Sequence, residues 1–324
     1  MKIAKIGLIG LGLLLLLVLS GLTYLSIAFP KVSEAPDIQI DGNAKQVARG
    51  KYLAYHVMMC ADCHSKRDFS KFSAPPSPGT EFTGGEVFDH SMGLPGVFIS
   101  PNITPYGIGG WTDGELYRLI TAGVRRDGEP IFPIMPYHSF GKSDPEDIKA
   151  VIAYLRTLDP VEKTHPERSV DFPVNFIMRT MPKDPEPMKK PEPTDLLAYG
   201  KYMFTAAACG DCHTKMEGGS FVGPVGGGGR EFGFPDGSIL RTPNLTPHET
   251  GIKYLSESDF IQRFKQYDVP DSQLATVQPG EFQTIMPWKM YAGMQEEDLR
   301  AIYHYLMSLA PYEHAVERFT PAKP

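Results

Sequence analysis

Cys-Ala-Asp-Cys-His at residues 60–64 and Cys-Gly-Asp-Cys-His at residues 209–213 are two copies of one pattern, Cys-x-x-Cys-His. The two copies contain all four cysteines of the 324-residue chain, so no thiol is left over for a structural disulfide. The paired thiols are three residues apart, which places them about one helical turn apart on the same side of a helix. A histidine follows each pair directly.

Three kinds of site use cysteine pairs at this spacing. Two pairs can hold zinc, and one pair can form a thioredoxin-type redox centre. Zinc does not require a histidine after each pair, and the sequence lacks the βαβ pattern of a thioredoxin. In c-type haem attachment, by contrast, the thiols form thioethers with the porphyrin and the histidine lies under the iron. We therefore predict two covalent haems c on Cys60, Cys63, Cys209 and Cys212, with His64 and His213 as iron ligands.

The sequence around each copy of the pattern repeats as well. Three motifs recur in the same order: Gly-Lys-Tyr, Pro-Asn-Ile/Leu-Thr-Pro and Ile-Met-Pro. They occupy residues 50–52, 101–105 and 134–136 in the first repeat and residues 200–202, 243–247 and 285–287 in the second. An amphipathic helix is predicted to close each repeat, at 144–158 and 295–309. Each closing helix carries an aspartate at the same place, Asp147 and Asp298.

The repeats predict two domains of one kind, at residues 44–160 and 196–314. Residues 161–195 between them are rich in proline, which stiffens the chain, and are predicted to be an extended linker. Residues 172–178 are too apolar for a free linker, so we expect this part to pack against one or both domains.

A methionine in each Ile-Met-Pro triplet is the predicted sixth ligand of each iron. Met135 follows His64 by 71 residues, and Met286 follows His213 by 73. Electron-transfer cytochromes commonly pair histidine with methionine, whereas other methionines fill gaps in cores. Other residues could be the sixth ligand, but none of them has a counterpart in the other repeat: His90, Met92, His138, Met290 and Met294.

Other polar residues receive weaker assignments. The paired Asn102 and Asn244, and Arg241 nearby, are candidates for holding the haem propionates. The remaining histidines are expected to be solvated: His56, His165, His248, His304 and His314.

The N-terminus contains an uninterrupted apolar stretch at residues 6–29, after Lys2 and Lys5. Twenty-four residues are enough to cross a bilayer, and the lysines favour an N-terminus inside with the rest of the chain outside. A signal peptide is the alternative, with a possible cleavage site at residues 26–28, but its apolar region is normally shorter. We predict that residues 1–30 are an anchor in the inner membrane and that the remainder lies in the periplasm or outside.

At this point the chain resembles the multihaem cytochrome c subunits of membrane-bound alcohol and gluconate dehydrogenases, and those that serve periplasmic molybdenum hydroxylases. The resemblance rests on the three repeated motifs and on Gly-Gly-Trp-Thr-Asp-Gly-Glu-Leu at residues 109–116, and it covers about residues 45–160 and 196–312. It implies an all-α fold: two tandem class I cytochrome c-like domains after one N-terminal transmembrane helix. The chain departs in having two haem patterns where many such subunits have three.

The function predicted is electron transfer by a membrane-anchored periplasmic di-haem cytochrome c. Its partners would be a dehydrogenase as donor and an oxidase or other cytochrome of the respiratory chain as acceptor. The alternative is a di-haem redox enzyme, of the peroxidase or thiosulfate-oxidising type, which needs one haem with an open position. No nucleic-acid partner is expected, because the net charge is -6 and no run of basic residues occurs.

Overall fold

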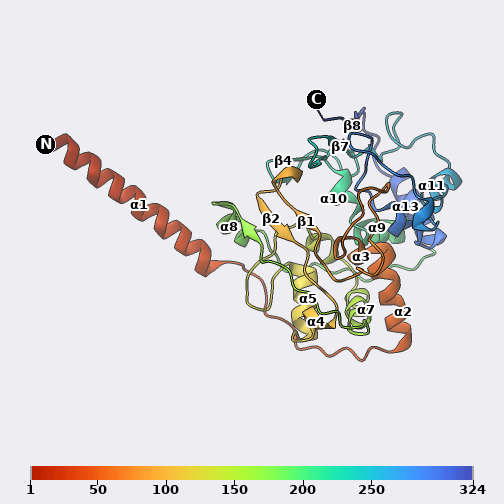
Figure 1. Ribbon diagram of the computed structural model, residues 1–324, viewed down its shortest axis with the longest axis horizontal. Helices are drawn as coiled ribbons and strands as arrows, with labels where there is room; N and C mark the ends of the chain where they lie inside the picture. The colour runs from red at the N-terminus through yellow and green to blue at the C-terminus, as the bar shows by residue number, and fades with distance from the viewer. Residues whose placement is uncertain (1, 323–324) are drawn as a thin grey trace.

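A long N-terminal helix stands apart from the rest of the chain in the computed structural model, which describes residues 2–322 (Figure 1). This helix, α1 (Lys2–Ala28), has 27 residues. Its segment Ile3–Ala28 is long and apolar enough to cross a membrane, and none of its apolar window is buried in the protein. The prediction of one apolar N-terminal helix is therefore confirmed.

Each repeat is built on a pair of crossing helices. In the first repeat α2 (Ala44–Tyr52), continued by the π-helix η1 (Leu53–Val57), packs on α7 (Pro145–Arg156). In the second, α9 (Leu196–Ala206) packs on α13 (Glu296–Met307), so both predicted closing helices are confirmed.

The glycine of each Gly-Lys-Tyr motif lies at the crossing point. A Cβ atom on Gly50 would lie 1.8 Å from the carbonyl oxygen of Ala150, and one on Gly200 would lie 1.9 Å from that of Ala301. Neither position has room for a side chain, because real Cβ contacts are never that short. The motif therefore repeats because the same close helix contact repeats.

Shorter helices and turns connect these pairs. The first repeat adds α3 (Cys60–Cys63), η2 (His90–Met92), α4 (Pro105–Ile108), α5 (Asp113–Ala122) and α6 (Tyr137–Phe140). The second adds α10 (Cys209–His213), α11 (Glu257–Lys265), η4 (Asp271–Gln273) and α12 (Trp288–Ala292).

The expectation of an all-α fold needs correction, because the described residues also form three small antiparallel sheets. The first contains β1 (Val87–Phe88), β2 (Gly96–Ile99) and β3 (Ser169–Val170) in that order. The third contains β6 (Glu231–Gly233), β7 (Ile239–Arg241) and β8 (Phe319–Thr320), and β4 (Met216–Glu217) pairs with β5 (Ser220–Phe221) between them. Long glycine-rich loops carry backbone groups that must be paired, and these short strands pair them.

The sheets bring the chain after each closing helix back onto its own repeat. In the first repeat the Asn102 side-chain amide donates to the carbonyls of Val161 and Lys163, at 2.8 and 3.0 Å. In the second the Asn244 amide donates to the carbonyl of Tyr312 at 2.7 Å. Both asparagines are buried and hold these returning segments, and their assignment to haem propionates stays a prediction.

Two histidines expected to be solvated cover glycines of the haem-pattern loops instead. His165 packs over Gly85, and His314 packs over Gly229, where an added Cβ would lie 2.9 and 2.5 Å from the respective imidazole ring. Each ring also hydrogen-bonds a backbone carbonyl of that loop. Residues 161–170, predicted as linker, thus contribute to the first repeat in the way that residues 312–320 contribute to the second.

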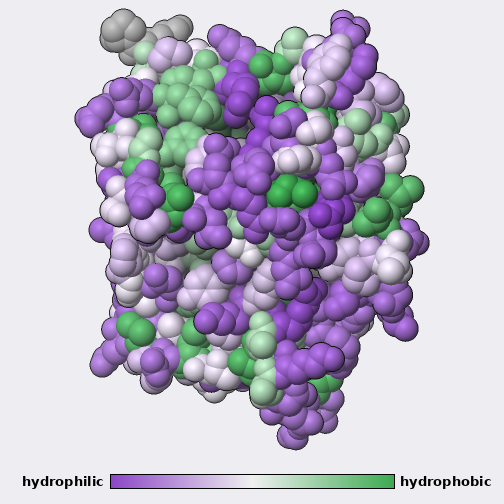
Figure 2. Space-filling model, turned by 90° about the vertical axis from the view of Figure 1, so that its right-hand side faces the viewer, coloured by the Kyte–Doolittle hydropathy of each residue, from purple (hydrophilic) through white to green (hydrophobic). Residues whose placement is uncertain are grey.

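The middle of the linker, residues 174–180, lies beside the end of α1 (Figure 1). Its α8 (Val174–Ile177) and η3 (Met178–Thr180) contact α1, and Met178 is buried as expected for the apolar middle of the linker. Phe172 and Ile177, however, are exposed. The opposite face of the body, turned away from α1, is mostly hydrophilic (Figure 2).

The two repeats are joined by reciprocal hydrogen bonds to two buried aspartates. Tyr52 of the first repeat donates to Asp298 of the second, and Tyr202 of the second donates to Asp147 of the first, the latter at 2.7 Å. These are the tyrosines of the Gly-Lys-Tyr motifs and the paired aspartates of the closing helices. Each repeat therefore completes the hydrogen bonding of the other.

The two aspartates differ in their remaining partners. Arg49 donates twice to Asp147, at 3.0 and 2.7 Å, whereas Tyr199 donates to Asp298 at 2.7 Å. Burial by itself would raise the pKa of Asp147, but the hydrogen bond and charge of Arg49, with the hydroxyl of Tyr202, outweigh it and hold that pKa below its usual value. Asp147 is therefore ionised at neutral pH.

The helix crossing generates a first prediction. We expect Gly50→Ala to destabilise the protein by about 2 kcal/mol or more, because the added methyl must displace backbone of α7. The free energy of unfolding in denaturant, measured on the full chain in detergent, tests this. The neighbouring Lys51→Ala, on the exposed side of α2, is the control and should cost under about 0.5 kcal/mol. Equal stability of both variants would contradict the prediction.

The buried aspartate generates a second prediction. Asp147→Asn should cost roughly 3 kcal/mol near pH 7, because Arg49 then lies partly buried without its anion. A carboxyl with a lowered folded pKa stabilises above its unfolded pKa, and this contribution is lost as the pH falls through the folded pKa. The gap between wild type and variant should therefore narrow as the pH falls below about 4.

The matched control for this measurement is Asp127→Asn, which removes the exposed pair with Arg125. It should cost under about 1 kcal/mol at neutral pH. A gap for Asp147→Asn that stays constant down to pH 3 would show that ionisation of Asp147 does not contribute.

Candidate functional site

Each Cys-x-x-Cys-His pattern begins directly after a residue in the left-handed conformation. Met59 has φ 54° and precedes α3, and Ala208 has φ 52° and precedes α10. Residues other than glycine rarely adopt this conformation. The same local backbone therefore turns the chain from the first helix of each repeat into the segment that carries the thiols.

The four cysteines are partly buried and form no disulfide. Burial raises the pKa of Cys60, Cys63 and Cys209 to about 12 and that of Cys212 to about 11. Thioredoxin-type cysteines have a lowered pKa, so the structure opposes that alternative. Across residues 2–322 no three His, Cys, Asp or Glu side chains lie close enough together to hold a metal ion.

The two histidines are oriented by the same contact. His64 Nδ1 lies 2.9 Å from the carbonyl oxygen of Pro101, and His213 Nδ1 lies 3.1 Å from that of Pro243. A carbonyl only accepts, so Nδ1 carries the proton and Nε2 keeps its lone pair for a metal. These prolines begin the repeated Pro-Asn-Ile/Leu-Thr-Pro motif, which explains why the motif recurs after each pattern.

Both imidazoles are neutral at physiological pH. Burial lowers the pKa of His64, and it lowers that of His213 to about 4, even though the bonded proline carbonyls favour the charged form. A neutral imidazole with one free nitrogen is the form that binds iron.

A cavity of about 440 Å³ lies beside the second pattern. Cys209, Cys212, His213 and Met286 all line it, together with many apolar side chains. Its size and lining are those of a site for a largely apolar small molecule. The thiols, the free imidazole nitrogen and the thioether that meet there are the donors that a covalently bound haem requires, so these residues fit the group.

The first repeat copies the methionine turn of the second. The backbone N–H of Tyr137 donates to the carbonyl of Met135 at 2.8 Å, and that of Trp288 donates to the carbonyl of Met286 at 2.7 Å. Trp288 lines the cavity beside the second pattern. Tyr137 takes the corresponding place in the first repeat, and its buried hydroxyl has no hydrogen-bond partner within residues 2–322. An unpaired buried hydroxyl of this kind is consistent with a polar group of a bound cofactor.

The rival ligands lie in different surroundings. His90 pairs with Asp171 at the surface, at 2.8 Å, and His138 is exposed. Met290 is buried in the core, and Met294 lines the same cavity as Met286. Met294 is thus the rival that the geometry leaves closest to the second site.

Residues that the sequence did not single out bring the two sites together. Met59, directly before the first pattern, lines the cavity beside the second. Ser139, just after the first methionine turn, donates to Asp211 inside the second pattern at 2.8 Å. Neither contact leaves a signal in the sequence, because both join residues from different repeats.

Three arginines also line the cavity beside the second pattern. Arg241, proposed from the sequence as a propionate partner, already donates to Glu231 and Thr320 at 2.7 Å each. Arg263 and Arg318 were not anticipated. A cavity with thiols and apolar walls and several guanidinium groups suits a ligand that is apolar over most of its surface and anionic at one edge.

Comparison with known proteins agrees with this site. Residues 197–310 match the cytochrome c family. The chain is 28% identical to the cytochrome c subunit of a quinone alcohol dehydrogenase from Gluconacetobacter polyoxogenes, over 86% of this chain and 59% of that subunit. It is 27% identical to the fructose dehydrogenase cytochrome subunit of Gluconobacter japonicus, over 83% and 56%. A diheme cytochrome c-type protein of Cereibacter sphaeroides is 28% identical, over 78% and 83%.

The predicted resemblance is therefore confirmed: the chain contains a cytochrome c domain and is related to cytochrome c subunits of dehydrogenases. Haem c and electron transfer are the cofactor and activity that this family implies. The chain spans less than two thirds of the length of the alcohol and fructose dehydrogenase subunits.

Proposed function

We propose that this protein is a membrane-anchored, periplasmic di-haem cytochrome c that passes single electrons from a dehydrogenase to the respiratory chain. The observation that carries the proposal is the matched setting of the two Cys-x-x-Cys-His patterns. Each follows a left-handed residue, and each histidine donates from Nδ1 to the proline of the same motif. Only the second repeat matches the cytochrome c family directly, so the first haem rests on this likeness.

The residues proposed to hold the two haems are the same in kind. Cys60 and Cys63 in the first repeat, and Cys209 and Cys212 in the second, would form the thioethers. His64 with Met135, and His213 with Met286, would bind the two irons. Haem iron held in this way supplies reversible one-electron oxidation and reduction. If a histidine and a methionine both bind each iron, no coordination position would be left for a substrate, which favours a carrier over an enzyme.

The contact between the two sites supports an electron path within one chain. Met59 extends from the first pattern into the cavity of the second, and Tyr291 is buried with its hydroxyl donating to the carbonyl of Ala207, just before the second pattern. The reciprocal tyrosine–aspartate bonds hold the repeats in this arrangement. An electron would therefore cross between haems through packed protein without a diffusing partner.

The membrane location rests on α1 and on the lysines that precede its apolar core. The hydrophilic face opposite α1 is suited to water, and the relatives named as dehydrogenase subunits supply the kind of partner (Figure 2). We infer a dehydrogenase as donor and a cytochrome or oxidase as acceptor. A signal peptide ending near residues 26–28 would give the same exported protein without its anchor.

Counting haems tests the first part of the proposal. Purified full chain should contain two haems that stay with the polypeptide after acid and organic extraction, measured by haem absorbance against protein mass. Replacing either cysteine pair by alanine should leave one haem per chain, whichever pair is replaced. One haem in the unaltered protein would contradict the di-haem assignment.

Optical spectra test the methionine ligands. The oxidised protein should show the far-red sulfur-to-iron band at a strength that fits two haems, because both irons bind a thioether. Met135→Ala and Met286→Ala should each remove about half of this band. Met294→Leu, which keeps the volume of the cavity wall, is the control and should leave the band intact.

The same spectra separate the carrier from its rival. One high-spin haem in the unaltered protein, with a band that fits a single thioether, would favour a di-haem enzyme with an open iron.

A further inference from the structure

We propose that Ser73, a residue of the first repeat, is a positioning residue for Met286, the iron ligand of the second repeat. This inference rests on the proposed role of Met286. It assigns to the first repeat control over the ligation, and hence the reduction potential, of the second haem.

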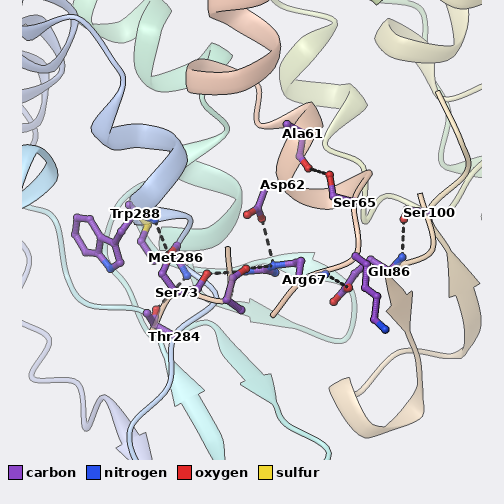
Figure 3. A network of polar contacts seen from close by, with 12 residues as sticks. Ala61, Asp62, Ser65, Arg67, Ser73, Glu86, Ser100, Thr284, Met286 and Trp288 are labelled. Atoms are coloured by element: carbon purple, nitrogen blue, oxygen red, sulfur yellow. Dashed lines mark hydrogen bonds and ion pairs between the residues drawn. The ribbon is translucent and has the colours of Figure 1, made fainter. Parts of the chain in front are cut away.

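The main evidence for this role is a pair of hydrogen bonds at the hydroxyl of Ser73 (Figure 3). Ser73 Oγ donates to the carbonyl oxygen of Met286 at 2.7 Å and accepts from the backbone N–H of Trp288 at 3.0 Å. Ser73 is only 1% exposed, so water cannot replace these bonds. One hydroxyl thus holds the backbone at both ends of the methionine turn.

A second side chain ties the same two segments together. Gln283 Oε1 accepts from the backbone N–H of Ser73 at 3.0 Å, and its Nε2 donates to the carbonyls of Phe69 and Lys71 at 3.0 and 2.9 Å. Gln283 is buried and lies three residues before Met286. The loop at residues 69–73 therefore both donates hydrogen bonds to the segment before Met286 and accepts hydrogen bonds from it.

The loop that offers Ser73 is itself held in place by a buried cation. Arg67 donates to the carbonyls of Ala74 and Ser73, at 2.9 and 3.2 Å, and lies 3.7 Å from Asp62 inside the first haem pattern (Figure 3). Ser73 and Ala74 both have positive φ, at 70° and 43°. Surrounding contacts must maintain such a backbone, and Arg67 supplies them.

The arrangement has no counterpart at the first methionine. Within residues 2–322, no side chain of the second repeat hydrogen-bonds residues 132–137, the turn that carries Met135. The second methionine turn is held directly by both repeats, whereas the nearest bond from the first methionine turn to the second repeat is that of Ser139 to Asp211. Loss of Ser73 should therefore affect one haem and spare the other.

The expected consequence follows from what the hydroxyl does. Without it, the Met286 carbonyl keeps only its bond from Trp288, and the Trp288 N–H loses one of its acceptors in a buried place. The turn then shifts and the thioether binds iron less well. Methionine ligation raises the potential of a c-type haem, so its weakening should lower the potential of the second haem.

The test uses Ser73→Ala and Ser73→Gly in the full chain. Glycine keeps the positive φ without strain and alanine keeps the Cβ, so an effect shared by both reports the lost hydroxyl. We expect two haems per chain, loss of up to half of the far-red band, and a fall in one of the two midpoint potentials. Repeating the substitutions in a Met135→Ala background, where the remaining band belongs to Met286, should remove that band.

Ser70→Ala is the matched control, because this exposed hydroxyl of the same loop bonds only Asp68. It should leave both potentials and the band unchanged. Two haems with an unaltered band and unaltered potentials in both Ser73 variants would overturn the inference, as would a change confined to the first haem. The haem count and band of the unaltered protein test the proposed function separately.

Discussion

The reciprocal bonding of two buried carboxylates is the constraint on which the rest of this structure depends. Asp147 and Asp298 each accept a hydrogen bond from a tyrosine of the opposite repeat. A buried carboxyl is costly unless its oxygens are paired, and in both closing helices part of that pairing comes from the opposite repeat. The two repeats are thereby held as one body. That placement brings Met59 to the second cavity and Ser73 to the second methionine turn.

Within each repeat, the positions of the thiols and of the imidazole that are proposed to bind haem follow from backbone constraints more than from side-chain packing. A glycine allows the first and last helices to touch, a left-handed residue turns the chain into the thiol pattern, and a proline carbonyl fixes the imidazole. Each device leaves little freedom for the group that it places. Apolar side chains line the cavity at the second site, which has room for a cofactor. A bound haem would pack against these side chains and so form part of the core of the repeat.

Features that depend on neighbouring residues could be predicted from the sequence, and features that depend on contacts between distant segments could not. The closing helices at 144–158 and 295–309 and the apolar N-terminal helix have a clear period or composition, and the structure contains them. The strands are two to four residues long, too short for an alternation to show, so an all-α fold was expected. His165 and His314 looked solvated because the glycines that they cover lie about 80 residues away along the chain. The linker was recognised by its prolines, but proline content does not distinguish a free segment from one whose end joins a sheet.

Two haem sites with the same four ligands would have equal potentials if ligands alone set them, and electron flow between them would then have no preferred direction. Potential depends also on hydrogen bonding and rigidity around the ligands. The repeats differ in this respect: the loop after the first pattern bonds the second methionine turn, whereas within residues 2–322 no side chain of the second repeat hydrogen-bonds residues 132–137. The internal repeat keeps the proposed ligands in each half, and the contact between the halves would make the two proposed sites unequal. An inequality of this kind is what a carrier needs in order to accept electrons at one haem and release them from the other.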